Sequence, residues 1–466
     1  MANDEFAIPS VVKEELRKLG YDIPSSMDSY IKQWNSWYTC THKFYKVHYI
    51  SATKKKRMSR DRYTIRPARK VCREWASLLL NETTEISVDN DEANIWLQGF
   101  LDRSGFWLTG QMTIEKAFAL GTAAWALWFD VSDGAVTSIK IRRYDARMVL
   151  PITWDEDGVD ECAFVTRVTI KGKTYTQLQI HILEESTYHI KTFIFDKDNK
   201  KVEAESLNII EDFDTEQENK TFGIVKPGLD NVVSDLSPYG ISVLYDAVET
   251  IKAVDLVWDA IMQEVDVARV RVFLDEALID VKDDNGKPVP VADIDDVAYR
   301  AVDKGPNNKP IDVVAPDLRI EPMKAALNAA LAELGDNTGF GEQYFQIDKS
   351  GGLKTATEVV SDNSTLMRNV RKHENVLEKA ISDVVTGLLS CASAKGYAPF
   401  KGEIGVVNVS FDDSIITDTQ TEKQLMLNEI SAGVLPKWKY ATTFYGMSEE
   451  EAKAALPEEE FTDIGF

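Results

Sequence analysis

The spacing of apolar residues changes twice along the chain and divides it into three parts. Residues 9–39, 68–82 and 112–130 place apolar side chains at helical spacing. From 135 to about 212 the period becomes two, as in "VTSIKIRRY" and "TYTQLQIHIL". That alternation predicts an antiparallel sheet with one face toward water. A helical period then returns and continues through most of the remaining chain.

The third part begins with a segment that predicts an unusually long helix, residues 236–276. After Pro-Tyr-Gly it runs for roughly thirty residues without a breaker, which at ~1.5 Å per residue is about 45 Å. Its apolar residues lie on all sides, a pattern typical of a helix packed against several neighbours, including copies of itself. A polar module with short strands, 271–322, follows and is typical of a compact α/β insertion.

Two more helices are predicted beyond this insertion. The first covers 323–335 and is expected to end at Gly335. A loop that contains several glycines separates it from an unbroken helical pattern between Thr355 and Lys395. A strand at 403–413 and a helical C-terminal region complete the chain. The sequence as a whole predicts an α+β fold.

The composition of the chain limits the classes of protein to which it can belong. The chain has 466 residues, 44% hydrophobic and 10% aromatic, which is enough for two to four domains with substantial cores. The four cysteines (Cys40, Cys72, Cys162 and Cys391) are scattered, which favours a reducing compartment without a disulfide framework. The N-terminus lacks the apolar stretch of a secretory signal, and no run approaches ~18 apolar residues. We expect a soluble intracellular protein.

The charge is strongly negative but unevenly distributed. The net charge is −23, yet Tyr30–Leu80 carries thirteen Lys and Arg against two acids, which leaves −34 for the rest. The stretch 54–73 concentrates the positive charge. It predicts either a surface for nucleic acid or an acidic partner, or a solvated loop that leads into a helix with a basic face. The acidic remainder disfavours tight wrapping on DNA, because such affinity depends on neutralising phosphates.

The glycine-bearing loop does not have the spacing of a nucleotide site. In "SGGLKTATEVV" (350–360), Leu353 separates Gly352 from Lys354, so the Gly-Lys-Thr of a P-loop is interrupted. No strand pattern leads into the loop either. Thr355 with Glu358 instead fits a capping box at the start of the following helix.

No catalytic constellation is found, and we expect no enzyme, no metal and no cofactor. The candidate zinc ligands lack the paired spacing of zinc sites, and the acidic residues of the insertion are typical of a solvated surface. The sequence contains no G-x-S-x-G. The residues considered are Cys40, His42, His48 and Cys72, then His181 and His189, and the acidic residues Asp283, Asp284, Asp293, Asp295 and Asp296.

Several longer stretches resemble bacteriophage portal proteins, the head-to-tail connectors, of the type found in long-tailed phages of Gram-positive bacteria. They are "YIKQWNSWY" with the basic stretch and "ARKVCREWASLLLNE", "SPYGISVLYDAVETIKAVDLVWDAIMQEV", "GLKTATEVVSDNSTLMRNVRKHENVLEKAI", and "EISAGVLPKWKY" with "YGMSEEEAKAAL". One departure is "WYTCTHKFYKVHY", which lacks the glycine expected soon after Trp-Tyr and leaves the local loop conformation open.

The resemblance implies a portal-type fold with named parts. These are a wing over 1–235, a stem helix over 236–270, a small α/β clip over 271–321, a second stem helix over 322–335, a tunnel loop over 336–354, a long kinked helix with a return to the wing over 355–413, and a helical crown over 414–466.

The resemblance also implies function, sites and partners. Portal proteins form a ring, typically of twelve copies, at one capsid vertex, through which double-stranded DNA is packaged and ejected. The implied partners are other copies of the chain, DNA, the terminase large subunit, head-completion or adaptor proteins, and the major capsid and scaffolding proteins, with no membrane. The implied location is the virion, after assembly in the host bacterial cytoplasm.

The resemblance implies that the tunnel loop faces DNA and that the clip docks the terminase and adaptor proteins. Glycines in the loop would let it flex, and Lys349 beside Asp348 would touch phosphates only weakly. The implied DNA-channel residues are Gly341, Gln343, Tyr344, Gln346, Asp348, Lys349, Ser350, Gly351, Gly352 and Lys354. The implied docking residues are Asp283, Asp284, Asn285, Lys287, Asp293, Asp295, Asp296 and Arg300.

Two alternatives stay open at this stage. Another phage structural protein, such as a minor head or baseplate component, would share the acidic composition but would lack the order helix, insertion, helix, loop, helix. A metal-dependent nucleic-acid enzyme would use the acidic residues of the insertion and would lose activity on replacing Asp293 and Asp295 with alanine.

Overall fold

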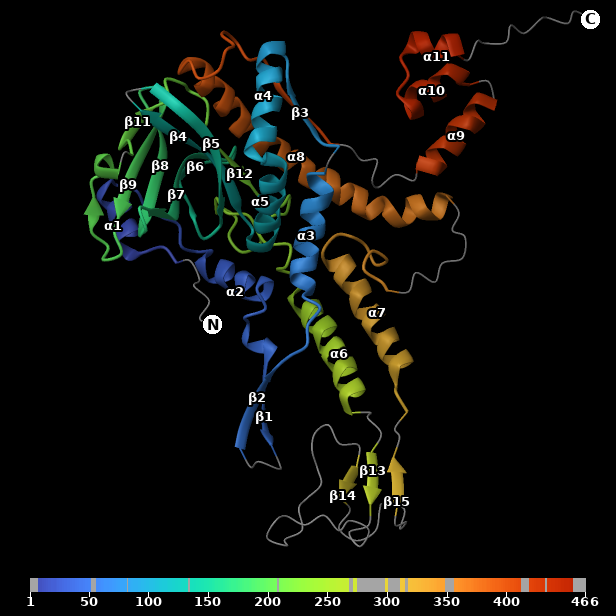
Figure 1. The fold of residues 1–466 in the computed structure, drawn as a ribbon. Coiled ribbons are helices and arrows are strands. Elements are labelled where there is room, and N and C mark those ends of the chain that lie inside the picture. The colour runs from blue at the N-terminus through green and yellow to red at the C-terminus, as the bar shows by residue number, and fades with distance from the viewer. Residues whose placement is uncertain are drawn as a thin grey trace, which may run out of the picture.

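Two antiparallel sheets and the helices around them form a body from which two stem helices project (Figure 1). The fold is α+β, as the sequence predicts. The computed structural model describes residues 7–51, 56–81, 83–132, 135–207, 209–267, 271–274, 298–300, 311–314, 317–347, 356–411, 419–431 and 434–455.

The body combines helices and strands from the first half of the chain with one later helix, α8. Its helices are α1 (Ser10–Lys18), α2 (Asp28–Tyr38), α3 (Pro67–Leu79), α4 (Asp91–Ser104), α5 (Phe106–Leu120) and α8 (Ala356–Ala394). The larger sheet has the order β10–β9–β8–β7–β6, with β11 beside β9, from β6 (Val149–Trp154), β7 (Val159–Ile170), β8 (Lys173–Glu184), β9 (Thr187–Phe195), β10 (Lys201–Val202) and β11 (Asp212–Asp214). The smaller sheet has the order β12–β4–β5, from β4 (Ala123–Ser132), β5 (Ala135–Asp145) and β12 (Phe222–Val225).

The remaining elements extend from this body. The hairpin consists of β1 (Lys46–Ser51) and β2 (Lys56–Asp61), and β3 (Glu85–Val88) pairs with β16 (Val407–Ser410). The stem consists of α6 (Val248–Val267) and α7 (Ile320–Asn337). Beyond it lie β13 (Arg271–Leu274), β14 (Ala298–Arg300) and β15 (Ile311–Val314), and the C-terminal region holds α9 (Thr419–Ser431), α10 (Lys437–Tyr445) and α11 (Glu449–Ala455).

The prediction that the larger sheet has one wet face is wrong. On β8 one face packs under α1, where Leu178 and Ile180 meet Val12. The alternate polar residues, Gln177, Gln179 and His181, are also buried, because they face the smaller sheet. Some of their polar atoms are bonded there, but Gln177 Nε2 and His181 Nε2 have no hydrogen-bond partner among the described residues. Gln179 accepts from the Tyr144 hydroxyl at 3.3 Å, and His181 Nδ1 lies 2.6 Å from Thr221 Oγ1.

The prediction of one helical pattern over 112–130 is also wrong, since α5 ends at Leu120 and β4 begins at Ala123. Gly121 terminates the helix in the left-handed region, with φ +83°. A Cβ there would lie 2.5 Å from the carbonyl oxygen of Gly240, so only glycine fits. The alanines of β4 are helix formers, but the strand lies between β5 and β12, and burial decides its conformation.

The first stem helix is shorter than predicted, with 20 residues that begin at Val248. The preceding segment is held in a non-helical path by bonds to the end of α5. The Gly240 N–H donates to Thr122 Oγ1 at 2.9 Å, and the Ser242 hydroxyl donates to the Phe118 carbonyl at 3.0 Å. These tertiary bonds replace the helical bonds that the local sequence would otherwise form.

The second stem helix passes through Gly335 rather than ending there. This glycine admits a close approach, because a Cβ on it would lie 2.2 Å from the Gly341 carbonyl oxygen. The Phe340 and Gly341 N–H groups both donate to the Gly335 carbonyl, at 2.8 and 3.0 Å. Helix α7 and the loop after it are therefore fixed against each other.

The predicted long helix and the strand after it are confirmed. Helix α8 runs for 39 residues and lies against β12. The capping box proposed at Thr355 lies outside the described residues. Strand β16 then pairs with β3, with Val407 opposite Val88, so the chain returns to the body (Figure 1). The C-terminal region is helical as predicted, and α10 contacts both α9 and α11.

The backbone conformation after Trp37-Tyr38 explains why a glycine is expected at this place. Cys40 adopts φ +56°, in the left-handed region that glycine occupies without cost. The loop therefore keeps a glycine-type backbone with a cysteine in it.

Helix α8 touches β12 and the residues just before it backbone to backbone at Gly387 and Gly223, which generates a test. A Cβ on Gly387 of α8 would lie 2.0 Å from the Lys220 carbonyl oxygen. Alanine normally stabilises a helix relative to glycine by about 0.5–1 kcal/mol. We expect Gly387→Ala to destabilise instead, by about 1–3 kcal/mol, because the helix must move off the strand. Thermal unfolding measures this.

Gly99 of α4 is the matched control. A Cβ there meets only the end of the flexible Arg103 side chain, at 3.0 Å. Gly99→Ala should leave the melting temperature unchanged or raise it. Equal effects of the two substitutions would show that the α8–β12 contact is not tight.

Candidate functional site

The two stem helices lie side by side and run in opposite directions (Figure 1). Leu327, Leu331 and Leu334 of α7 are buried. On α6, Leu256 and Val265 are 53% and 49% exposed. The prediction that apolar residues lie around the stem helix is confirmed, since its outer faces keep apolar surface as well.

Asp255 of α6 is fully buried and binds the segment between β2 and α3 together with Tyr45, which precedes β1. It accepts hydrogen bonds from the Tyr45 hydroxyl at 3.1 Å, the Thr64 hydroxyl at 2.8 Å and the Ile65 N–H at 3.1 Å. Burial raises the pKa of Asp255 to about 6, although these three hydrogen bonds and the charge of Arg62 act to lower it. One carboxylate of the stem thus organises a loop nearly 200 residues earlier in the chain.

Asp259, one turn further along α6, binds the same segment through arginines. Arg60 donates both guanidinium N–H groups to it at 2.7 Å, and Arg62 donates at 3.1 Å. The Tyr63 N–H adds a bond at 3.0 Å. Burial acts to raise the pKa of Asp259, but the Arg60 hydrogen bonds, the Tyr63 N–H and the arginine charges hold it below the usual value.

The α6 carboxylates, Asp255 and Asp259, bind part of the basic stretch 54–73 and so determine its role in the fold. Arg60 and Arg62 form an internal bridge between hairpin and stem rather than a surface for a partner. The described part of the stretch, 56–73, contains β2 and the start of α3 rather than a solvated loop alone.

The described part of the predicted tunnel loop, 338–347, is packed against the body. Phe340 packs against Trp75 with ring centroids 4.4 Å apart, and the Trp75 indole donates to the Thr338 carbonyl at 3.0 Å. The Tyr344 hydroxyl donates to Glu74 at 3.0 Å. The glycines in this part serve a fixed turn, with φ +83° at Gly339 and +86° at Gly341.

The structure describes four of the ten predicted channel residues. Gly341, Gln343, Tyr344 and Gln346 belong to this packed part, with Gln343 exposed. The other six, Asp348, Lys349, Ser350, Gly351, Gly352 and Lys354, lie outside the described residues.

The predicted clip is represented by a three-stranded sheet beyond the stem. Strand β13 is central, antiparallel to β15 and parallel to β14, where Arg300 lies opposite Leu274. The short strands predicted for this insertion are thereby confirmed. The other predicted docking residues (Asp283, Asp284, Asn285, Lys287, Asp293, Asp295 and Asp296) lie outside the described residues.

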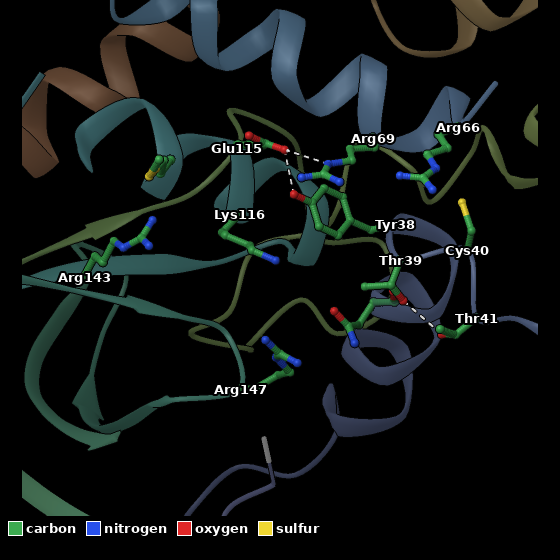
Figure 2. Close-up of a pocket in the computed structure, with 12 residues that line it drawn as sticks. Tyr38, Thr39, Cys40, Thr41, Arg66, Arg69, Glu115, Lys116, Arg143 and Arg147 are labelled. Atoms are coloured by element: carbon green, nitrogen blue, oxygen red, sulfur yellow. Dashed lines mark hydrogen bonds and ion pairs between the residues drawn. The ribbon is translucent and has the colours of Figure 1, made fainter. Parts of the chain in front are cut away.

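A cavity of about 570 Å³ opens between α2, α3, α5 and β5 (Figure 2). Its lining joins five cationic side chains from three separate stretches of sequence to one carboxylate, Glu115. We call it the basic pocket. The cations are Arg66, Arg69, Lys116, Arg143 and Arg147.

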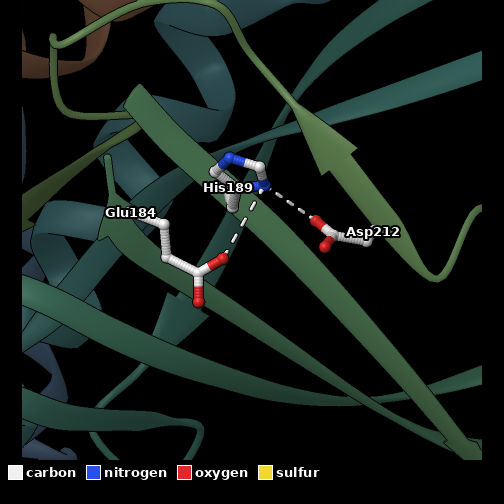
Figure 3. Close-up of side chains that lie close together, drawn as sticks. All are labelled: Glu184, His189 and Asp212. Carbon is white, nitrogen blue, oxygen red and sulfur yellow. Dashed lines mark hydrogen bonds and ion pairs between the residues drawn. The ribbon is translucent and has the colours of Figure 1, made fainter. Parts of the chain in front are cut away.

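Among the described residues, one group of side chains is close enough for a shared metal ion: Glu184, His189 and Asp212 (Figure 3). His189 Nδ1 lies 3.0 Å from Asp212 and 4.0 Å from Glu184. Lys191 already donates to Glu184 at 2.6 Å. The negative charge of Glu184 is therefore neutralised by a cation of the protein. Of the two histidines considered together in the sequence, His189 belongs to this group, whereas His181, buried and with its pKa lowered to about 3, is bonded to Thr221.

A family model for phage portal proteins, described as SPP1 Gp6-like, matches residues 27–462. The chain belongs to this portal family. No curated protein matches it. Portal proteins are structural parts of the phage capsid rather than enzymes, and they assemble with the capsid and the DNA-packaging machinery. In the part of the portal chain that is described, none of the helices has the length and apolar character needed to cross a bilayer.

Sequence reasoning missed the α6 carboxylates and most of the basic pocket. Two acids four residues apart within the otherwise apolar stretch 253–262 were a usable signal for Asp255 and Asp259, since such residues are rarely buried without partners. The partners themselves could not be found from the sequence, because they lie about 200 positions away. Lys116 and Arg147 gave no local signal.

Removing Asp259 should loosen the portal hairpin from the stem. Asp259→Ala leaves two arginines and the Tyr63 N–H without their acceptor, and we expect a loss of about 2–3 kcal/mol. Glu264→Ala is the control on the same helix, because Glu264 also binds an arginine, Arg319, but at the surface. It should change little. Melting temperature and protease cleavage in the hairpin measure both, and similar results for the two variants would refute the role of Asp259.

The raised pKa of Asp255 gives the portal chain a specific pH dependence. Its folded pKa of about 6 lies above the ordinary value of 3.8, so its contribution to stability is complete below pH 3.8 and is lost as the pH rises through 6. Between about pH 5 and 7.5 this amounts to about 1 kcal/mol. Asp255→Asn should lack that component. We expect the difference in unfolding free energy between the unmodified protein and Asp255→Asn to change by about 1 kcal/mol over this pH range. A difference that stays constant with pH would contradict the raised pKa of Asp255.

Proposed function

We propose that this portal protein forms a closed ring of twelve copies around a channel for double-stranded DNA. The ring would occupy one vertex of the capsid, where DNA is packaged and later ejected. Its clip would dock the terminase large subunit and then the adaptor proteins. The order helix, three-stranded insertion, helix, loop and long helix supports this role, and it is the observation that carries the proposal.

The surface of the stem supports ring formation. Helix α6 buries one side against α7 and the body, while Leu256 and Val265 remain largely exposed. A helix with apolar side chains on its outer face gains about 25 cal/mol per Å² when another copy covers them. The clip strands lie at the end of the stem away from the body, where a partner can reach them (Figure 1).

The charge of the chain supports passage rather than capture of DNA. At a net charge of −23, most of the surface repels phosphates, so DNA could slide past without being held. The loop that contains Lys349 and Lys354 would face the DNA and touch it weakly. The anchoring of residues 338–347 would hold the base of that loop in place.

Electron microscopy of the purified protein, with its mass from light scattering, tests the ring. We expect a particle of about twelve copies with a central hole wide enough for duplex DNA. Leu256→Glu should weaken ring assembly, because it places a charge in the proposed contact. Ile95→Glu is the control, since Ile95 is 75% exposed on α4, away from the stem. A compact dimer with metal-dependent nuclease activity would disprove the proposal.

A packaging assay tests the loop. Replacing Lys349 and Lys354 with serine and shortening the glycine loop should reduce DNA packaging or retention, because weak phosphate contacts are lost. Lys197→Ser with Lys200→Ser, in an exposed turn, removes the same charge elsewhere. If packaging and retention were unchanged in the loop variant, the loop would not be the DNA-facing element.

A further inference from the structure

The basic pocket is a concentration of positive charge in an acidic protein. Arg69 lies on α3, and Arg66 directly precedes that helix. Lys116 lies on α5. Arg143 lies on β5, and Arg147 lies in the turn after that strand (Figure 2). Helix α3 packs on α5, and α5 packs on β5, so the cavity wall is formed by elements of the core. The arrangement is therefore held by the fold rather than by loose surface side chains.

The protein neutralises only part of this charge. Arg147 is bound by Asp145, with contacts of 3.1 and 2.6 Å, and Arg69 lies 3.8 Å from Glu115. Glu115 is itself occupied by the Tyr38 hydroxyl, which donates to it at 2.6 Å. Among the acids in the described ranges, none forms an ion pair with Arg66, Lys116 or Arg143. Three cations of the described residues therefore border the cavity without a direct ion pair.

Lys116 is the most constrained of them. It is half-buried, and its ammonium lies 4.3 Å from the centre of the Tyr38 ring. Burial lowers the pKa of Lys116, Asp145 and Glu115 act to raise it, and Arg147 and Arg69 add to the lowering. An anion in the cavity would relieve both the desolvation and the repulsion between like charges.

The chemistry of the cavity indicates the type of anion. Four of the five cations are arginines, whose planar N–H groups match phosphate oxygens in pairs. Lys116 occupies the Tyr38 ring face at 4.3 Å and Arg69 lies 5.9 Å from the ring centre, so the ring is not open for a base to stack on. Recognition would therefore depend on charge and hydrogen bonding rather than on an apolar group.

We propose that the basic pocket binds a phosphate-bearing anion, supplied either by a free oligophosphate or by the backbone of a nucleic acid. The site lies on the body of the protein, apart from the proposed channel loop. It does not depend on ring formation, so it can be tested on the chain in any state of assembly.

Isothermal titration calorimetry of the full-length protein with inorganic triphosphate, at low ionic strength, tests the site. Arg66→Ser with Arg143→Ser removes two exposed cations that have no ion pair, so the fold should tolerate it. Each charged hydrogen bond that is lost should weaken binding about tenfold. Lys116→Met is the second variant, which keeps the side-chain stem beside Tyr38. Lys197→Ser with Lys200→Ser is the charge-matched control and should bind as the unmodified protein does.

The outcomes separate the possible sources of phosphate. Saturable triphosphate binding that the pocket variants weaken and the control keeps would support a free oligophosphate ligand. Binding of a short DNA duplex alone, with the same dependence on the pocket variants, would support a nucleic-acid backbone. No binding, or equal binding by pocket variants and control, would overturn the proposal. A changed particle mass in the pocket variants with unchanged phosphate binding would also overturn it, in favour of carboxylates from a second copy.

Discussion

The burial of two carboxylates on one turn of α6 is the constraint on which the junction between stem and body depends. A buried carboxylate is costly unless hydrogen bonds or cations compensate it. Asp255 uses hydroxyl and backbone donors, whereas Asp259 uses two arginines. The hairpin and the start of α3 must stay against the stem for these groups to be satisfied, so the orientation of the stem follows from them.

Close backbone contacts fix the other elements around this junction. Glycines allow α5, α7 and α8 to approach neighbouring backbone where any side chain would collide, as at Gly121, Gly335 and Gly387. Such contacts tolerate little sliding, because a displacement of even a few tenths of an ångström brings atoms into overlap. The body is therefore held by steric fit, while the stem junction is held by electrostatics.

Much of the architecture could be predicted from the sequence because it depends on periodicity. The change from a helical period to a period of two located the sheets, and the return to a helical period located the stem helices and α8. The errors have one cause. Gln177, Gln179 and His181 alternate as a solvated face does, and no local pattern shows that a second sheet covers them. Likewise, the path of 236–247 depends on Thr122 and Phe118, more than 100 residues earlier.

The candidate sites were less predictable, since they combine distant parts of the chain. The basic stretch was visible as charge, but its division between an internal bridge at Arg60 and a cavity wall at Arg66 depends on which groups face it after folding. Resemblance to portal proteins supplied the roles of the stem, clip and loop, which periodicity alone could not supply.

The pairing of β3 with β16 has a consequence for how the chain folds during synthesis. Val88 lies opposite Val407, and Asp89 accepts from the Val406 N–H and the Asn408 side chain at 3.1 and 3.2 Å. The edge of β3 must therefore wait, unpaired, until more than 300 further residues have left the ribosome. An exposed strand edge can pair with other chains during that interval. Because β3 has only four residues, it offers a short template to such partners.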